Sequence, residues 1–273
     1  MFLEDGKSRA EITEKGAYVK SLKLSGSEIL KPSEDGEQTH GGMAILLPFA
    51  NRVRNAKYLW EGEEYYLPQN NGDHSIHGFT RDMKWDLKKA AENKVVGTLD
   101  MTNSGYPVDL RLKVTFLISA HAFTTSIEAI NMGKVTAPFV AGMHPYFNFN
   151  GSWHLESFQN LLRLNYESEY FPDGSLTPVK PKCLNSETGI TFDNTYITNS
   201  IPTLVAGDRK IRIETSNMPY LVLYNGKYAG KISVAAEPMS GAPDAYNNGI
   251  GLATIQPGDS FQCSATFRTI SVA

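Results

Sequence analysis

Apolar and polar residues alternate along several stretches of this chain. In "DLRLKVTFLI" (109–118), two leucines, a valine and a phenylalanine take alternate positions, with charged or polar residues between them. The same period of two recurs in "SFQCSATFRTI" (260–270), and "DRKIRIETS" (208–216) and "YLVLYNG" (220–226) are further short strand candidates. Because successive side chains of a β-strand point to opposite faces, the alternation predicts strands with one buried and one solvated face.

Turn signals separate these strands at short intervals. They are "NNGD" (70–73), "NSGYP" (103–107), "PDGS" (172–175), "AGD" (206–208) and "PGD" (257–259). One stretch, "ESFQNLL" (156–162), is a candidate for a turn or two of helix. No linker, low-complexity tract or internal repeat divides the chain, so we expect one domain over residues 1–273. Many short strands with little helix predict an all-β fold, either a large antiparallel sandwich or a barrel.

Composition excludes several classes of function. The net charge is −3 and the basic residues are scattered, whereas a nucleic-acid partner needs a basic face. The two cysteines, Cys183 and Cys263, are too few for a disulfide scaffold and lack the spacing of a structural zinc site. Residues 1–20 lack the apolar core of a signal peptide, and no run approaches the ~18 apolar residues of a membrane helix. We therefore expect a cytoplasmic protein with no membrane partner.

The chain also lacks the common motifs of nucleotide and serine-hydrolase chemistry. No GxGxxG opens a helix, no GxxxxGK[ST] loop occurs, and no GxSxG elbow is present. We predict that the protein uses no cofactor.

Polar and aromatic side chains gather in four stretches that break the alternation. These stretches cover residues 46–68, 70–85, 142–151 and 234–249, and their candidates for chemistry are Arg52, Arg54, His74, His77, Arg81, Trp85, His144 and Glu237. His144 precedes a proline amid aromatic residues and asparagines. Glu237 follows a small, apolar strand, where desolvation is expected to raise its pKa.

Each candidate also has a structural explanation. A histidine among aromatic residues is more often structural than catalytic, Arg52 could pair with an acid at a strand end, and Glu237 could cap a loop. His74 and His77 are three positions apart, a spacing that suits metal binding on a helix. The glycines and asparagines around them indicate a loop instead, so we predict no metal site.

Taken together, the set favours acid–base chemistry on a neutral polyol. Histidine gives and takes a proton near neutral pH, and a buried glutamate with a raised pKa is a suitable partner. Tyr146, Phe147 and Trp85 offer apolar faces for sugar C–H groups. Asparagine and aspartate side chains offer directional hydrogen bonds to hydroxyl groups.

Several motifs together resemble the aldose 1-epimerases, or galactose mutarotases. They are "NRV" (51–53), "IHGF" (76–79) followed by Trp85, "HPYFNF" (144–149), and "EP" with "PDAYNNG" (237–249). They occur in the family's order and span roughly residues 40 to 260. The resemblance implies a large antiparallel β-supersandwich and interconversion of the α- and β-anomers of free aldohexoses of the glucose and galactose type.

The resemblance also implies a role for each matched residue. Glu237 is expected to be the general base that removes the proton of the C1 hydroxyl, and His144 the general acid that protonates the ring oxygen. His77 and Arg52 are expected to hydrogen-bond ring oxygen and hydroxyl groups. Further predicted substrate contacts are Asn51, Tyr146, Arg81 and, in the looser motif "TFDNTYI", Asp193.

Two other functions stay open at this point. "HGFTRDMKW" (77–85) is similar to the version in hexose-6-phosphate 1-epimerases, so Arg54 and Arg81 could hold a phosphate through their guanidinium groups. Alternatively, both arginines are solvated or pair with Asp82 and Glu61. The second function is a non-catalytic carbohydrate-binding β-sandwich, which would have no use for an acid–base pair. The segment "EPMSGAPDAYNNG" (237–249) instead resembles the branch of the family that acts on free sugars, which favours the free sugar.

Overall fold

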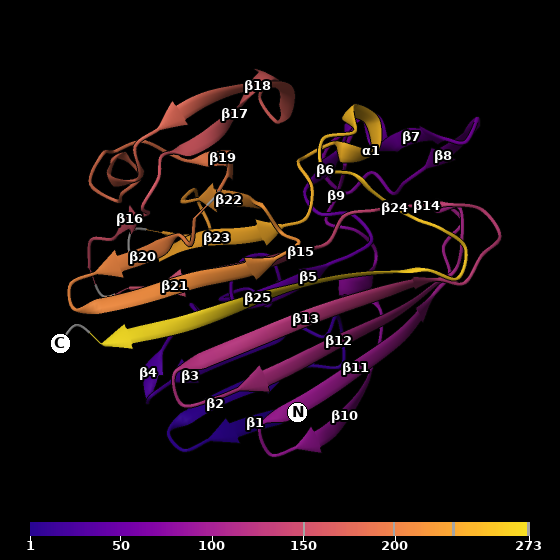
Figure 1. The fold of residues 1–273 in the computed structure, drawn as a ribbon. Helices are drawn as coiled ribbons and strands as arrows, with labels where there is room; N and C mark the ends of the chain where they lie inside the picture. Colours follow the sequence, from indigo (N-terminus) through magenta and orange to yellow (C-terminus); the bar gives the residue numbers. More distant parts are fainter. Residues whose placement is uncertain (150, 199, 231–232, 272–273) are drawn as a thin grey trace.

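The computed structural model describes residues 1–149, 151–198, 200–230 and 233–271, which form two large antiparallel sheets (Figure 1). The larger sheet has eleven strands. Their order is β1 (Phe2–Asp5), β2 (Ser8–Ile12), β3 (Val19–Leu24), β5 (Met43–Leu46), β15 (Gly142–Asn148), β23 (Ser233–Met239), β22 (Tyr220–Tyr224), β19 (Asp193–Ile197), β17 (Leu161–Ser168) and β18 (Phe171–Val179), with β4 (Ser27–Glu28) beside β3.

The second sheet has eight strands. Their order is β10 (Asp86–Ala91), β11 (Lys94–Met101), β12 (Leu110–Ile118), β13 (Ala122–Asn131), β25 (Ser260–Ser271), β21 (Arg209–Ser216), β20 (Thr203–Ala206) and β16 (His154–Glu156). Three two-stranded sheets complete the β-structure: β6 (Arg52–Val53) with β9 (Ser75–Ile76), β7 (Lys57–Trp60) with β8 (Glu63–Tyr66), and β14 (Ala137–Phe139) with β24 (Ala253–Ile255). The helical segments are α1 (Ala245–Asn248), η1 (Arg54–Ala56), η2 (Thr80–Asp82) and η3 (Pro181–Cys183).

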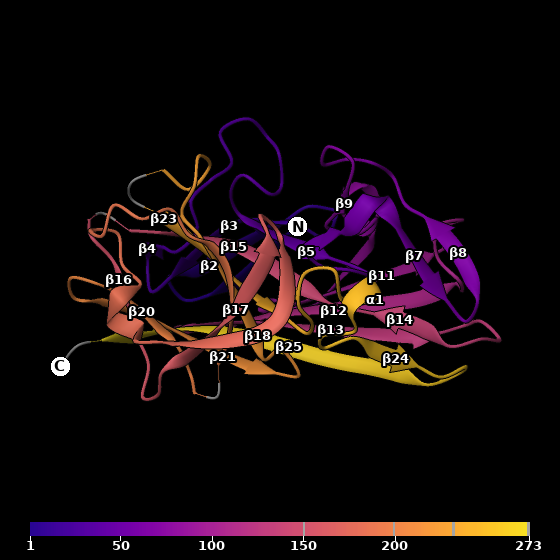
Figure 2. The same ribbon diagram turned by 90° about the horizontal axis from the view of Figure 1, so that it is seen from above.

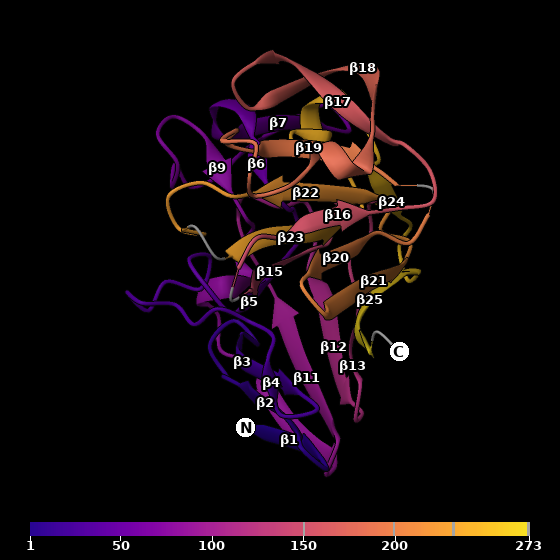
Figure 3. The ribbon, with the colours of Figure 1, turned by 90° about the vertical axis from the view of Figure 1, so that its left-hand side faces the viewer.

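The two large sheets pack face to face as layers, as the views along and across the strands show (Figures 2 and 3). Alternate residues of each strand fill the space between them. On β15, Met143 and Phe147 point into this core, and the Phe147 ring meets the edge of Phe267 on β25 at a centroid distance of 5.0 Å. Strand accounts for 55% of the structure and helix for 5%, which confirms the predicted all-β supersandwich.

The predicted strands are confirmed, including the alternation of β12, whose even-numbered residues are buried. The helix predicted at 156–162 is wrong. Glu156 ends β16, Leu161 begins β17, and Phe158 between them is 99% exposed, so this short segment has no buried apolar face to stabilise a helix.

The predicted turn at 172–175 is also wrong, because "PDGS" forms a bulge inside β18. Leu164 and Tyr166 of β17 pair with Leu176 and Pro172, so two positions on one strand oppose four on the other. Gly174 takes a φ of +86° here, a conformation that glycine adopts readily.

Candidate active site

A cavity of about 570 Å³ lies on the face of the eleven-stranded sheet that points away from the eight-stranded sheet. Its floor comes from the central strands β15, β23, β22 and β19. Pairing of Tyr146 with Ala235, of Ala235 with Tyr224, and of Tyr224 with Asp193 sets one row of side chains across these four strands. Directly opposite residues share a face, so this row is the cavity floor.

The same register explains why two residues 93 positions apart come together. Gly142 pairs with Met239 and Tyr146 with Ala235, and these two pairs bracket His144 and Glu237 on neighbouring strands. Since His144 is two residues from Tyr146, it points to the cavity and not to the core. His144 Nε2 lies 3.4 Å from Glu237 Oε1.

Both groups are almost fully buried, with His144 6% and Glu237 2% exposed. The pKa of the His144 imidazole is lowered to about 3, mainly by burial and in smaller part by the Arg81 cation. Burial raises the pKa of the Glu237 carboxyl well above its usual range, and Asp193 acts in the same direction. Burial therefore favours the neutral form of each group, although they lie within ion-pair distance. His144 Nδ1 and Glu237 Oε2 have no hydrogen-bond partner in the protein, so a ligand could use both.

A small two-stranded sheet brings two of the sequence motifs to one side of the cavity. Arg52 on β6 pairs with Ile76 on β9, and the His77 backbone N–H donates to the Asn51 carbonyl at 3.0 Å. Asn51 and His77 have φ values of +59° and +66°, a left-handed conformation that costs energy in residues with a side chain. Such strain often occurs where side chains must point toward a ligand.

His77 belongs to the same buried cluster. Its ring lies edge-on to His144 at a centroid distance of 5.4 Å, and its Nδ1 has no partner. Burial lowers the pKa of His77 well below 6.5, and the neighbouring His144 and Arg81 act in the same direction. His77 is therefore neutral at physiological pH. One of its ring nitrogens can donate a hydrogen bond and the other can accept one.

Asp193 and Arg52 face each other across the cavity floor. Asp193 begins β19, and its Oδ2 lies 3.9 Å from Arg52 Nη2. Arg52 Nε also donates to Asn71 Oδ1 at 2.9 Å, and its guanidinium lies over the Tyr170 ring at 3.7 Å. Burial raises the pKa of Asp193, while the Arg52 cation opposes that rise.

All eight predicted site residues line the cavity. These are Asn51, Arg52, His77, Arg81, His144, Tyr146, Asp193 and Glu237. Arg81 lies on η2, its Nε is buried without a partner, and burial lowers its pKa. Glu237 lies within β23, not after the end of a strand as the sequence pattern indicated.

Other expectations are corrected by the structure. Trp85 and Phe147 are fully buried in the core, so they cannot offer their faces to a ligand. Arg54 does not line the cavity, because its side chain pairs with Glu167 and with Asp244 and lies over the Phe171 ring.

The partners expected for the two arginines are engaged elsewhere. Glu61 accepts a hydrogen bond from Thr136, and Asp82 pairs with Lys15 at 2.9 Å.

His74 does not line the cavity. Its Nδ1 accepts from the Asn55 backbone N–H at 3.1 Å, and its ring packs edge-on against Phe171. Within the ranges that the structure describes, no group of three or more His, Cys, Asp or Glu residues is arranged to hold a metal ion. None of the described helices has the length and apolar character to cross a membrane.

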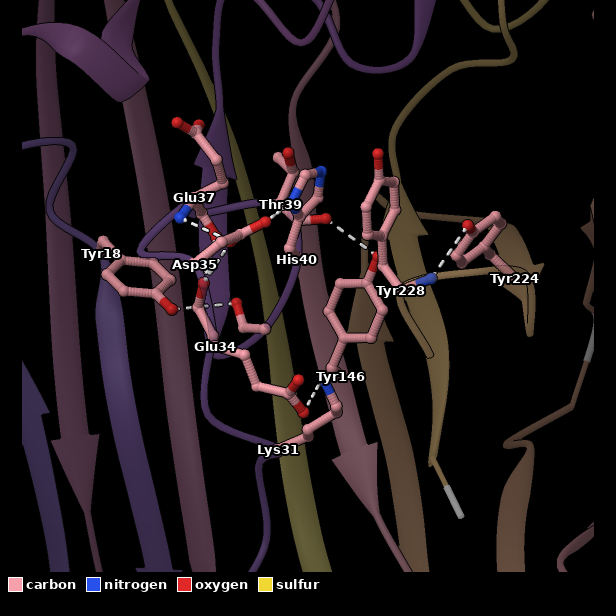
Figure 4. A network of polar contacts seen from close by, with 12 residues as sticks. Tyr18, Lys31, Glu34, Asp35, Glu37, Thr39, His40, Tyr146, Tyr224 and Tyr228 are labelled. Carbon is pink, nitrogen blue, oxygen red and sulfur yellow. Dashed lines mark hydrogen bonds and ion pairs between the residues drawn. The ribbon is translucent and has the colours of Figure 1, made fainter. Parts of the chain in front are cut away.

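Several residues that line the cavity were not among the candidates from the sequence. They are His40, Tyr224 and Tyr228, with the polar residues Gln38 and Asn71. His40 and Tyr228 come from two loops, residues 31–42 and 225–230, and their rings stack on each other (Figure 4). One signal could have found His40: it stands before two consecutive glycines in an irregular segment.

Comparison with known proteins agrees with this fold. The family model described as aldose 1-epimerase matches residues 2–268. The uncharacterized protein YihR of Escherichia coli K12 is 29% identical, over 94% of this chain and 88% of that protein. The aldose 1-epimerase of Haemophilus influenzae is 25% identical, over 66% of this chain and 62% of that protein. The chain therefore belongs to the aldose 1-epimerase family.

Solved structures with the same fold cover nearly the whole chain. The GalM/aldose epimerase homologue of Caenorhabditis elegans superposes with a TM-score of 0.85 at 19% identity, over 100% of this chain and 99% of that chain. The galactose 1-epimerase of Lactobacillus acidophilus superposes with a TM-score of 0.81 at 19% identity, over 99% of this chain and 93% of that chain. At these identities the likeness concerns the fold alone.

Proposed function

We propose that the protein is an aldose 1-epimerase that interconverts the α- and β-anomers of free aldohexoses of the glucose and galactose type. The observation that carries this proposal is the buried His144–Glu237 pair, 3.4 Å apart in a polar cavity, with one unsatisfied polar atom on each side chain. A non-catalytic sugar-binding module would gain nothing from burying such a pair, because burial of ionisable groups costs free energy.

In the proposed reaction, the Glu237 carboxylate takes the proton of the C1 hydroxyl. The C1–O5 bond breaks, its electron pair goes to O5, and the His144 imidazolium gives O5 a proton. The products are the open-chain aldehyde, a protonated Glu237 and a neutral His144. Rotation about C1–C2 and the reverse proton transfers close the ring with the other configuration at C1.

The pKa shifts support this assignment. A raised pKa makes Glu237 a stronger base, and a lowered pKa makes His144 a stronger acid. Burial favours a protonated Glu237 and a neutral His144, and these are also the protonation states of the two groups after the ring has opened. Desolvation of the pair therefore assists the ring-opening step, for which no cofactor is needed.

The surrounding residues have roles that suit a neutral polyol. His77 and Arg52 would donate hydrogen bonds to ring oxygen and hydroxyl groups, Asp193 would accept them, and Asn51 would hold Arg52 through its Oδ1. Tyr146 lines the cavity but is only 1% exposed, and its ring stacks on His144 at a centroid distance of 5.0 Å, so it would hold that imidazole in place beneath the sugar.

Arg81 favours a second candidate, a hexose-6-phosphate 1-epimerase. Arg81 is half-buried in the cavity wall, its Nε has no hydrogen-bond partner in the protein, and a phosphate would be a strong partner for its guanidinium. The engagement of Arg54 with Glu167 and Asp244 leaves one arginine, not two, for that role. Because Arg54 is not free to bind a phosphate, we favour the free sugar over the phosphosugar as the substrate.

Polarimetry of freshly dissolved α-D-glucose and α-D-galactose tests the proposal. A faster approach to the same final rotation supports it. No acceleration with either sugar, followed by acceleration of glucose 6-phosphate exchange that Arg81→Ala removes, would favour the phosphosugar. Sugar binding without any exchange would favour the binding module. A single domain and a cytoplasmic location stay predictions.

A further inference from the structure

A histidine outside the family motifs lies in the cavity wall. His40 belongs to the 31–42 loop, which closes on itself at its base (Figure 4). The Lys31 N–H donates to the Tyr146 carbonyl at 2.8 Å, and the Gly42 N–H donates to the Lys31 carbonyl at 2.7 Å. Inside the loop, the Glu37 N–H donates to Asp35 Oδ1 at 3.0 Å. These bonds fix the path of the loop above the sheet.

The two glycines after His40 allow a close approach that other residues would prevent. A Cβ atom on Gly41 would lie 2.3 Å from the Ser33 nitrogen, and one on Gly42 would lie 2.3 Å from Tyr18 Oη. On the other side of His40, the Tyr146 hydroxyl donates to the Thr39 carbonyl at 2.9 Å. The backbone of His40 is therefore held against a residue of the cavity floor.

The ring of His40 is held as firmly as its backbone. His40 Nδ1 lies 2.7 Å from Asp35 Oδ2, and this hydrogen bond is the main cause that lowers the pKa of Asp35 to about 2. An ionised carboxylate only accepts, so Nδ1 carries a proton. The ring also lies flat on Tyr228, with centroids 3.4 Å apart and planes 11° apart. Nε2 is the ring nitrogen left for a ligand.

We propose that His40 is a substrate-contacting residue whose Nε2 hydrogen-bonds to one hydroxyl group of the bound sugar. This proposal rests on the proposed function and adds a residue that determines sugar preference. His40 lines the same cavity as His144 and Tyr146, and its side chain is 22% exposed. A hydroxyl both donates and accepts, so it matches Nε2 whether or not that nitrogen carries a proton. Asp35 and Tyr228 act as positioning residues.

The test compares the parent aldohexose with its monodeoxy analogues. His40→Phe keeps a flat ring for Tyr228 but removes both ring nitrogens. Dissociation constants come from calorimetry, and kcat/KM from anomer exchange measured by NMR. We expect His40→Phe to weaken binding of the parent sugar by about 3–10-fold, the usual size for one hydrogen bond. For the one analogue that lacks the contacted hydroxyl, we expect His40→Phe and the wild-type protein to bind with equal affinity.

A purely structural role for His40 gives a different result. In that case His40→Phe weakens the parent sugar and every analogue by the same factor, which would overturn the proposal. His154→Phe is the matched control, since His154 also pairs with a carboxylate, Glu156 at 3.5 Å, but lies outside the cavity. Circular dichroism checks folding, and His40→Leu, which also lacks any hydrogen-bonding group, replaces His40→Phe in the same comparison if the latter fails to fold.

The two proposals fail in distinguishable ways. If the wild-type protein binds the sugars without catalysing exchange, the proposed function is wrong, while the affinities still test His40. If exchange is catalysed but no analogue escapes the loss, only the His40 proposal is overturned. A wild-type protein that binds none of these sugars overturns both.

Discussion

The outer faces of the two large sheets have the same backbone geometry and opposite chemistry. On the eight-stranded sheet, charged residues alternate with buried ones and pair in solvent, as in Lys113–Glu128 at 3.4 Å and Arg268–Glu214 at 3.0 Å. On the eleven-stranded sheet, every residue of β23 is buried, including Glu237.

Strand geometry cannot explain this difference in burial, since it is the same in both sheets. The loops that cover one sheet and not the other explain it. The eight-stranded sheet leaves its outer face in water, whereas segments around His40 and His77 cover the centre of the other sheet and form the cavity. Figure 2 shows the 31–42 loop on the side of the molecule away from β25. A carboxylate on a strand therefore becomes a candidate base only where loops remove its water, since desolvation raises its pKa.

The largest expected effect is the loss of activity in Glu237→Gln. The amide keeps the size of the side chain but cannot accept the anomeric proton, so the rate of anomer exchange should fall by about 10²–10⁴-fold. NMR exchange spectroscopy of the two anomers measures this rate. Glu128→Gln is the matched control on the exposed sheet, where Glu128 pairs with Lys113, and we expect its activity to equal that of the wild type. Equal activity of both variants would remove Glu237 from the mechanism.

His144→Gln should lower the same rate by about 10²–10³-fold, because the ring oxygen then leaves without a proton donor. If the two groups act as a unit, the double variant His144→Gln/Glu237→Gln should be little worse than Glu237→Gln alone. Fully multiplicative losses would mean that the two residues act in separate steps.

The pH profile of kcat/KM is the next expected effect. The active form of the pair holds one proton, so activity should persist from the lowered pKa of His144, about 3, to the raised pKa of Glu237. With ordinary values the profile would instead decline above the histidine pKa of about 6.5. A stopped assay over the pH range in which the protein stays folded measures it. A decline centred near pH 6.5 would contradict the pKa shifts of His144 and Glu237. A rate that does not change with pH, up to both ends of the range, would contradict the acid–base scheme.

Local sequence signals predicted the strands with one exposed face well, but they did not predict the fully buried strands or the bulge in β18. Alternation identified β12, β21 and β25 because one face of each strand is wet, whereas the three central residues of β22 are all buried. The same rule cannot indicate β15 or β23, which are buried on both faces. Turn chemistry at "PDGS" was present, but pairing with β17 converted it into a bulge.

The site was predicted through its motifs and not through local physics. His144 and Glu237 meet because β15 and β23 are neighbours, a fact of topology that no local pattern contains. Aromatic residues illustrate the limit: Tyr146 and Phe147 are adjacent, and a strand sends one to the cavity and the other to the core. His40 was missed because its place depends on loop closure and a stacked ring contributed by a distant segment.

Glu237→Gln should also stabilise the fold at alkaline pH. The folded-state pKa of Glu237 is raised, so the folded protein holds a proton that the unfolded chain releases above pH ~4.5, and stability is lost as pH rises from there. A neutral amide abolishes this loss. We expect the free energy of unfolding to rise by about 1–3 kcal/mol at pH 8 and the gain to shrink toward pH 5. Thermal melts at both pH values measure it, and an equal gain at both would contradict the assignment to ionisation.

The smallest effect is expected where the exposed sheet carries its ion pairs. The side chains of Lys113 and Glu128 are 49% and 27% exposed, and water and salt screen their attraction. A double-mutant cycle with Lys113→Met and Glu128→Gln should give a coupling of about 0.5 kcal/mol or less, since exposed pairs rarely contribute more. Urea unfolding of the four proteins measures this coupling. A coupling above about 2 kcal/mol would show that the outer face of the eight-stranded sheet is less solvated than its exposure indicates. Access of water would then not explain the contrast between the outer faces of the two sheets.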